Sequence, residues 1–385
     1  MLFNSLKMNL PFKYGKIIDD DFFVNRSSEI DFLKRNIKSK INLILISPRR
    51  WGKSSLVSKI ARSMAKDEKK IKFCFIDLYN VRNEEEFYNY FATEILKASY
   101  SKWDERVENA KLFFKQIIPK FSFGLDPNQE FSISFDWDNI SKNQQEILDL
   151  PEVVSKAKNI QLVICLDEFQ NLSFFDDPLS FQKKARATWQ KHQNCSYVLY
   201  GSKRHMMAEL FENKSMPFYK FGEVILLSKI ETHHWQEYII EKFKSTKKNI
   251  SKELAEFLTQ KVENHSYFVQ QLANAVWLEV NKACSKEDIE NGLDKLLLQY
   301  ELFFNREVDG LSNLQLNLLK ALAADEKELS SKKTIKKYNL SSSASVNRSK
   351  EALIQKEIID VFEKKIEFID PIFKIWINNT YNKRL

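Results

Sequence analysis

The stretch at residues 47–55 has the residue types that phosphate binding requires, because it reads Ser-Pro-Arg-Arg-Trp-Gly-Lys-Ser-Ser. A phosphate-binding loop needs backbone N–H groups that point inward, a helix N-terminus aimed at the anion, a lysine, and a hydroxyl for Mg²⁺. We expect Lys53 to reach the β- and γ-phosphates of a bound nucleotide and Ser54 to bind Mg²⁺. Gly52 would let the backbone approach the phosphates closely.

The loop departs from the pattern G-x-x-x-x-G-K-[ST] at one position, because Ser47 stands where the first glycine is expected. Its surroundings argue against the alternative of a basic surface loop. Residues 41–46 are β-branched and nearly all apolar, which is typical of a strand buried in a parallel sheet, and an amphipathic helix follows through about Lys66. The residues expected to contact the nucleotide are Ser47, Pro48, Arg49, Arg50, Trp51, Gly52, Lys53, Ser54 and Ser55.

A second group of candidate residues lies at the ends of two further apolar runs, each expected to form a strand. Residues 162–168 read Leu-Val-Ile-Cys-Leu-Asp-Glu. We expect Asp167 to hold Mg²⁺, mostly through water, and Glu168 to polarise the water that attacks the γ-phosphate. The alternative is a pair of solvated carboxylates that cap the following helix. Ser202 would contact the γ-phosphate or orient water, unless it is a plain turn serine. The expected catalytic residues are thus Glu168, Lys53 and Ser202.

Phosphoryl transfer often needs an arginine or lysine that neutralises developing charge. A solvated surface position is the alternative for each cation of the chain. The sequence leaves five candidates open: Arg49, Arg50, Arg186, Arg204 and Lys220.

Strand and helix patterns alternate through the first part of the chain, which predicts an α/β fold with a doubly wound parallel sheet and right-handed crossovers. Ser27 or Ser28 is expected to cap the first helix. A β-hairpin is expected at 121–137, around the turn residues Asp126-Pro127-Asn128. The strands expected in the parallel sheet are 41–46, 72–78, 161–167 and 196–201.

The strand signals fade after about residue 226, and this change predicts the domain organisation. Residues 1–226 would form the sheet domain and residues 227–304 a helical lid. Residues 305–385 predict three helices followed by a β-hairpin, which is the layout of a winged helix.

The composition is that of a globular protein: of 385 residues, 43% are hydrophobic and 29% are charged. The net charge of +8 permits contact with nucleic acid but equally suits a lysine-rich proteome. The four cysteines and five histidines lack the spacing of a metal site, so we interpret them as structural. No signal peptide and no apolar run long enough to span a membrane is expected, which indicates a cytoplasmic location without membrane contact.

Six sequence stretches together resemble the archaeal-type ATPase family, prokaryotic P-loop proteins close to the STAND and AAA+ groups. The resemblance implies an ATPase core, a helical lid and a C-terminal winged helix. It also implies that the segment from Phe23 to Arg26 lies near the adenine, so Val24 and Arg26 would contact the nucleotide. Members often have a Gly-Arg pair near Phe221-Gly222, and this sequence lacks that arginine. The stretches are Phe23-Val24-Asn25-Arg26 with Glu29, and residues 47–56, 166–170, 201–207, 217–222 and 370–376.

Two kinds of partner, besides ATP and ADP, remain as alternatives. Residues 330–350 carry Lys332, Lys333, Lys336, Lys337, Arg348 and Lys350 without an acidic residue. Together with a wing near 364–365, residues 330–365 would bind double-stranded DNA. Against this, residues 301–385 as a whole hold 15 basic and 12 acidic side chains. The alternative is a nucleotide-controlled switch that binds a protein partner or a second copy of the chain.

Overall fold

The computed structural model describes residues 10–114, 121–125, 131–135, 144–362 and 365–382. The chain forms two compact units. The sheet unit contains Arg26–Pro48 and Lys53–Ser228. The helical unit contains Arg49–Gly52, Lys229–Leu385 and the N-terminal residues up to Asn25. Four residues of the candidate phosphate loop therefore belong to a different unit from the strand and helix on either side of them.

The sheet unit is built on a five-stranded parallel sheet with the order β2-β5-β6-β1-β7. Because β6 pairs with both β1 and β5, its carboxyl end lies between the carboxyl ends of these two strands. The segments that follow β1, β5 and β6 thus meet at one edge of the sheet, which is where ligands bind in this class of fold. The strands are β1 Leu43–Ile46, β2 Ile71–Asp77, β5 Gln161–Asp167, β6 Cys195–Gly201 and β7 Glu223–Leu226.

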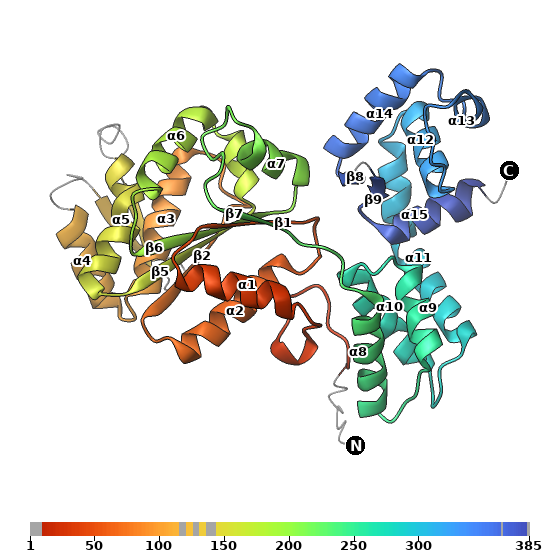
Figure 1. Ribbon diagram of the computed structural model, residues 1–385, viewed down its shortest axis with the longest axis horizontal. Helices are drawn as coiled ribbons and strands as arrows, with labels where there is room; N and C mark the ends of the chain where they lie inside the picture. Colours follow the sequence, from red (N-terminus) through yellow and green to blue (C-terminus); the bar gives the residue numbers. More distant parts are fainter. Residues whose placement is uncertain (1–9, 115–120, 126–130, 136–143, 363–364, 383–385) are drawn as a thin grey trace. The chain divides into compact units, whose positions relative to one another are not determined.

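Helices cover both faces of this sheet (Figure 1). On one face lie α1 (Ser27–Lys38) and α2 (Lys53–Asp67), and on the other lie α3 (Glu84–Ser99), α5 (Gln144–Lys158) and α6 (Pro178–Trp189). All residues of β1 and β6 are buried, as expected for central strands, whereas burial alternates along the edge strand β2.

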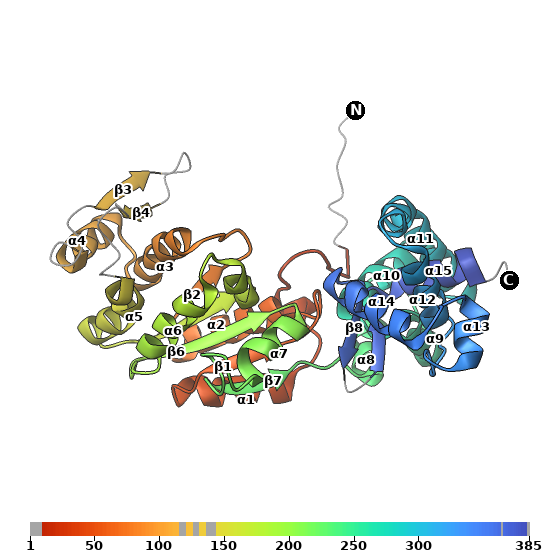
Figure 2. The same cartoon turned by 90° about the horizontal axis from the view of Figure 1, so that it is seen from above.

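The helix α4 (Trp103–Phe114) and an antiparallel hairpin of β3 (Phe121–Leu125) and β4 (Phe131–Phe135) extend the sheet unit near α3 (Figure 2). Side chains of α3 hold the hairpin: Thr93 Oγ1 accepts from the backbone N–H of Ile133 at 3.0 Å, and Asn89 Oδ1 accepts from that of Phe135 at 3.1 Å. The expected hairpin is confirmed, and its turn residues lie outside the described residues.

The helical unit has its own continuous hydrophobic core, which includes Trp235, Phe304 and Trp376. Two lysines add ion pairs inside it. Lys374 Nζ lies 2.8 Å from carboxylate oxygens of Glu263 and Asp325, and Lys229 Nζ bridges Glu263 and Glu367. Its elements are α8 Thr232–Ser245, α9 Lys252–Lys261, α10 Ser266–Glu279, α11 Lys286–Asp309, α12 Asn313–Ala323, α13 Lys332–Tyr338, α14 Ser343–Gln355, β8 Ile359–Phe362, β9 Lys365–Phe368 and α15 Pro371–Ile377.

One local expectation was wrong, and two elements were not foreseen. The capping position of α1 is Arg26 with a left-handed φ of 86°, and neither Ser27 nor Ser28 caps the helix, since both lie inside its first turn. A fifth parallel strand, β7, was not expected, because it has only four residues and its outer position leaves Val224 and Leu226 exposed. The helix α7 (Arg204–Glu212) was also not foreseen.

Gly222 gives a test of the pairing between β7 and β1. A Cβ atom on Gly222 would lie 2.2 Å from the backbone oxygen of Asn42, which also accepts the N–H of Glu223 at 2.9 Å. We expect Gly222→Ala to lower the free energy of unfolding by about 1–3 kcal/mol or more, because backbone atoms must shift. The control is Gly310→Ala, whose Cβ would meet its nearest atom at 3.5 Å. Equal stability of the two variants in urea unfolding would contradict this packing.

Candidate functional site

The candidate phosphate loop leaves β1 at Ile46 and ends where α2 begins at Lys53. Lys53 is buried, and its Nζ donates to the backbone oxygens of Ser47 at 2.8 Å and of Pro48 at 3.0 Å. Gly52 has a φ of 94°, in the left-handed region that favours glycine, so the loop needs this residue for its backbone conformation. The buried ammonium group is thus held beside the start of α2 by the loop's own carbonyl groups.

Ser54 belongs to the phosphate loop motif and Asp167 to the acidic end of β5, and the two residues meet at the edge of the sheet. Ser54 Oγ, in the first turn of α2, donates to Asp167 Oδ2 at 2.7 Å, although 113 positions separate the two residues. Burial raises the pKa of Asp167 to about 6, partly opposed by the hydrogen bond from Ser54. A hydroxyl and a carboxylate are hard oxygen donors of the kind that Mg²⁺ prefers, so this pair fits that ion.

Glu168 follows Asp167 with a left-handed φ of 50°. Its Oε2 accepts from Ser202 Oγ at 2.8 Å, and Ser202 follows the end of β6. Of the three residues expected for catalysis, the structure brings Glu168 and Ser202 into contact. Lys53 instead contacts the carbonyl groups of its own loop. Ser55 is buried in the first turn of α2.

The loop residues Arg49, Arg50 and Trp51 pack within the helical unit. Arg49 Nε lies 3.3 Å from Oε2 of Glu357, which follows α14. The guanidinium of Arg50 lies over the ring of Tyr267, 4.6 Å from its centroid. The buried indole of Trp51 meets the ring of His265 edge-on. The phosphate loop is thus part of the packing of the helical unit as well.

The two residues assigned to the adenine by resemblance have different surroundings. Val24 is buried in the hydrophobic core of the helical unit. Arg26 is buried in the sheet unit, where its guanidinium lies 2.8 Å from Glu29 Oε1. Asn25 between them donates through Nδ2 to Nε2 of His234, and Asn25 and Arg26 have left-handed φ values of 40° and 86°. Such backbone strain in two consecutive residues is typical of functional segments.

The sequence analysis missed Gln170, a buried amide that donates to the Glu168 carboxylate. The available signal was Gly201. In a chain with only seven glycines, this one ends the buried strand β6, and a Cβ atom there would lie 2.0 Å from Oε1 of Gln170.

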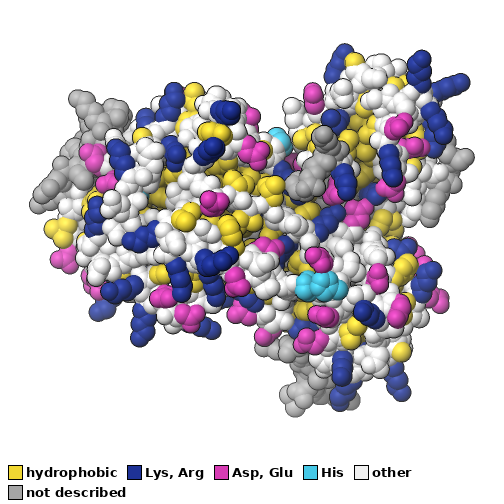
Figure 3. All heavy atoms as spheres, in the orientation of Figure 1, with side chains coloured by type: hydrophobic (Ala, Val, Ile, Leu, Met, Phe, Trp, Pro, Cys, Tyr) yellow, Lys and Arg dark blue, Asp and Glu magenta, His cyan; other side chains and the backbone are white. Residues whose placement is uncertain are grey.

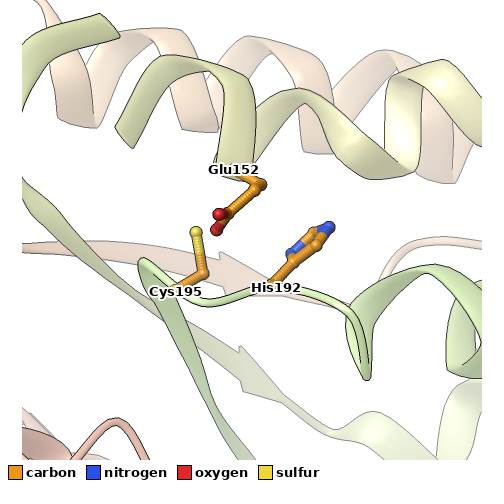
Figure 4. A group of neighbouring side chains, drawn as sticks. All are labelled: Glu152, His192 and Cys195. Atoms are coloured by element: carbon orange, nitrogen blue, oxygen red, sulfur yellow. The ribbon is translucent and has the colours of Figure 1, made fainter. Parts of the chain in front are cut away.

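A second polar cluster lies at the other end of β6, where Glu152, His192 and Cys195 approach one another (Figure 4). Each of these side chains already has a protein partner. Glu152 accepts from the backbone N–H groups of Gln193 and Asn194, and Cys195 Sγ lies 3.4 Å from Ser155 Oγ. The two ring nitrogens of His192 contact Asp149 and Tyr197. This cluster is a hydrogen-bond network that fixes the turn before β6.

Comparison with solved structures reveals the same fold in known proteins. A Walker-type ATPase of Pyrococcus abyssi is 15% identical, with a TM-score of 0.65, over 96% of this chain and 99% of that chain. The ORC2 protein of Aeropyrum pernix in its ADPNP–ADP complexes is 12% identical, with a TM-score of 0.54, over 97% of this chain and 99% of that chain. The fold expected from the sequence, a P-loop ATPase fold, is therefore confirmed.

The expected winged helix is also confirmed, because the model of a family described as a probable winged helix domain matches residues 302–379. No curated protein matches this sequence significantly. Of the helices in the described part of the chain, none has both the length and the apolar character required to cross a membrane.

Glu152 provides a test of the cluster before β6. Glu152→Ala should lower the free energy of unfolding by about 2–4 kcal/mol, because two backbone N–H groups lose a charged acceptor. Burial alone would raise the pKa of Glu152, but the hydrogen bonds from Asn194 and Gln193 outweigh it and lower the pKa. The stabilisation is therefore present at neutral pH and disappears as the pH falls through the lowered pKa, so the difference between the two proteins should shrink in acid.

The measurement is urea unfolding from neutral pH to pH 4, with Glu152→Gln as the variant that keeps the shape and loses the charge. A chelator should leave the melting temperature of the unaltered protein unchanged. A melting temperature that falls with chelator in the unaltered protein but not in Glu152→Gln would instead identify the cluster as a metal site.

Proposed function

We propose that this chain is a Mg²⁺-dependent ATPase that binds ATP at residues 47–55 and hydrolyses it. The hydrogen bond between Ser54 and Asp167 carries the proposal. It joins the start of the helix after the phosphate loop to the acidic end of a buried strand, which is the arrangement that phosphoryl transfer requires. A shared fold with a Walker-type ATPase, and with an ORC2 protein in complexes with ADPNP and ADP, supports it.

The roles of the side chains follow from their positions. Lys53 would exchange the carbonyl oxygens of Ser47 and Pro48 for the β- and γ-phosphate oxygens, which would give its buried charge anionic partners. Ser54 and Asp167 would hold Mg²⁺, which neutralises charge on the phosphates. Glu168 would accept the proton of the attacking water, and Ser202 would orient Glu168.

The remaining loop residues would complete the nucleotide site. The N–H groups of the loop from Pro48 onward, apart from that of the proline itself, would point at the phosphates, as in other phosphate loops. The segment containing Val24 and Arg26 would lie beside the adenine, and the strained backbone at Asn25 and Arg26 supports a role for it. We divide the chain into an ATPase core to residue 226, a lid to residue 304 and the winged-helix domain beyond it.

Double-stranded DNA is the partner that the winged helix favours. Lys332, Lys333 and Lys336 of α13 are exposed, as are Asn347 and Arg348 of α14. The segment 341–344 at the start of α14 has small, exposed side chains that allow the helix N-terminus to approach a phosphate. On the face drawn in Figure 3, basic and acidic side chains are interspersed.

ATP turnover tests the site. Lys53→Ala should reduce turnover about 100-fold or more by removing phosphate binding. Glu168→Gln should reduce turnover by a similar or larger factor through loss of the base, while ATP still binds. Lys66→Ala, which removes an exposed lysine later in α2, is the control and should retain turnover. A coupled phosphate-release assay and titration with a fluorescent ATP analogue measure the two properties. Retained turnover in Lys53→Ala would refute the assignment.

DNA binding is tested by fluorescence anisotropy with a duplex oligonucleotide over a series of salt concentrations. Arg348→Ala should weaken binding and reduce the slope of log affinity against log salt by about 1, because one phosphate contact is lost. Lys72→Ala removes an exposed charge from β2 and should leave the slope unchanged. Absence of duplex binding together with salt-tolerant self-association, measured by sedimentation, would instead support the protein-interaction switch.

A further inference from the structure

Gln170 is a buried polar side chain that the mechanism above does not use. It lies in the 3₁₀ helix Phe169–Phe174 after β5 and is 1% exposed. Its Nε2 donates to Oε2 of Glu168. Within the described part of the chain, its Oε1 has no hydrogen-bond partner. An unpartnered buried oxygen costs about 1–3 kcal/mol, so the position of this amide calls for an explanation other than stability.

The amide of Gln170 occupies the space beside Gly201 where a side chain would otherwise lie. A Cβ atom at position 201 would lie 2.0 Å from Gln170 Oε1 and 3.1 Å from its Cδ. The left-handed glycines among the described residues are Gly15 and Gly52, so the backbone of Gly201 does not itself require a glycine. The Sδ atom of Met207 would also lie 2.7 Å from a Cβ atom at position 201, so the absence of a side chain at Gly201 is explained by the space that Gln170 and Met207 occupy.

The carboxylate of Glu168 is held from two directions. Gln170 reaches it from the segment after β5, and Ser202 reaches it from the segment after β6 through Oγ at 2.8 Å and through its backbone N–H at 3.4 Å. Among the described residues, the hydrogen bonds recorded for this carboxylate fall on Oε2. Oε1 is then the oxygen that remains to accept a hydrogen bond from water, and its orientation is fixed by the bonds to Oε2.

We propose that Gln170 is a positioning residue for Glu168, which it holds, together with Ser202, in the orientation that activates water. This inference rests on the proposed function, because it takes Glu168 as the base. Loss of the amide leaves the carboxylate with Ser202 alone, and the reacting geometry becomes less well defined. A misplacement of about 1 Å can cost roughly 100-fold in rate.

The first experiment replaces the amide with an apolar side chain of similar length. Gln170→Met should reduce the turnover number about 10- to 100-fold and change the affinity for ATP by less than about twofold. Gln182→Met is the matched control. Gln182 is also 1% exposed, lies in α6 of the same unit and also has an unpartnered Oε1, but it does not contact Glu168. This control should keep its turnover number.

The second experiment displaces Gln170 without altering it. Gly201→Ala should reduce turnover by a factor similar to that of Gln170→Met, because the new methyl group takes the place of the amide oxygen. In the double variant Gln170→Ala/Gly201→Ala, the methyl group meets no amide. Its remaining close contact is with Met207 Sδ, in a flexible side chain that can shift, so turnover should be no lower than in Gln170→Ala alone. Such non-additivity is the signature of two residues that act through one contact.

A third readout does not depend on turnover. In a crystal structure of the nucleotide-free Gln170→Met protein, the Glu168 carboxylate should be less well ordered than in the unaltered protein, because Ser202 alone then holds its Oε2. Thermal unfolding of all variants without nucleotide separates loss of fold from loss of orientation.

The outcomes distinguish the proposed role of Gln170 from the proposed ATPase function. If the unaltered protein hydrolyses ATP, loses this with Glu168→Gln and keeps it in Gln170→Met, the proposal for Gln170 is wrong and the proposed function stands. If Gln170→Met and Gln182→Met lose turnover, ATP affinity and thermal stability to the same extent, Gln170 is a packing residue and the proposal is again overturned. If the unaltered protein neither binds nor hydrolyses ATP, the proposed function itself fails.

Discussion

The double pairing of β6 is the constraint on which the candidate site depends. Gly201 is in register with Ile46 of β1, and Leu199 is in register with Leu166 of β5. Because neighbouring parallel strands end level with one another, the residues that follow them lie at the same edge of the sheet. The hydrogen bonds from Ser54 to Asp167 and from Ser202 to Glu168 both follow from this register. A shift of one residue in β6 would turn its buried side chains to the opposite face and separate these groups.

The phosphate loop has a second set of contacts, and these belong to the helical unit. Arg49 pairs with Glu357 beside the winged-helix hairpin, Arg50 covers Tyr267, and Trp51 is buried against His265. Burial lowers the pKa of His265 to about 3, so this ring is neutral at physiological pH and adds no charge beside the loop. These three loop residues are thus packed within the helical unit.

Periodicity and motif spacing were sufficient to predict the central sheet and the winged helix. The buried strands are continuous apolar runs, and the lysine, hydroxyl and acidic residues follow them at the expected places. Sequence reasoning failed where a tertiary contact decides the structure. The edge strand β7 has four residues with little burial. Arg26 rather than a serine occupies the N-cap of α1, and its buried guanidinium pairs with Glu29. Gln170 was missed because its contact with Glu168 depends on a local 3₁₀ turn, and no spacing rule reveals the space beside Gly201.

We propose above that residues 47–55 and Asp167 form one nucleotide site. Isothermal titration calorimetry of the intact chain with ATP, in the presence of Mg²⁺ and again with a chelator, tests it most directly. We expect one ATP bound per chain. Its affinity should fall when Mg²⁺ is removed, and it should fall further in the Asp167→Asn variant. Absence of heat from ATP binding under both conditions, or an affinity that is indifferent to both Mg²⁺ and Asp167, would contradict it.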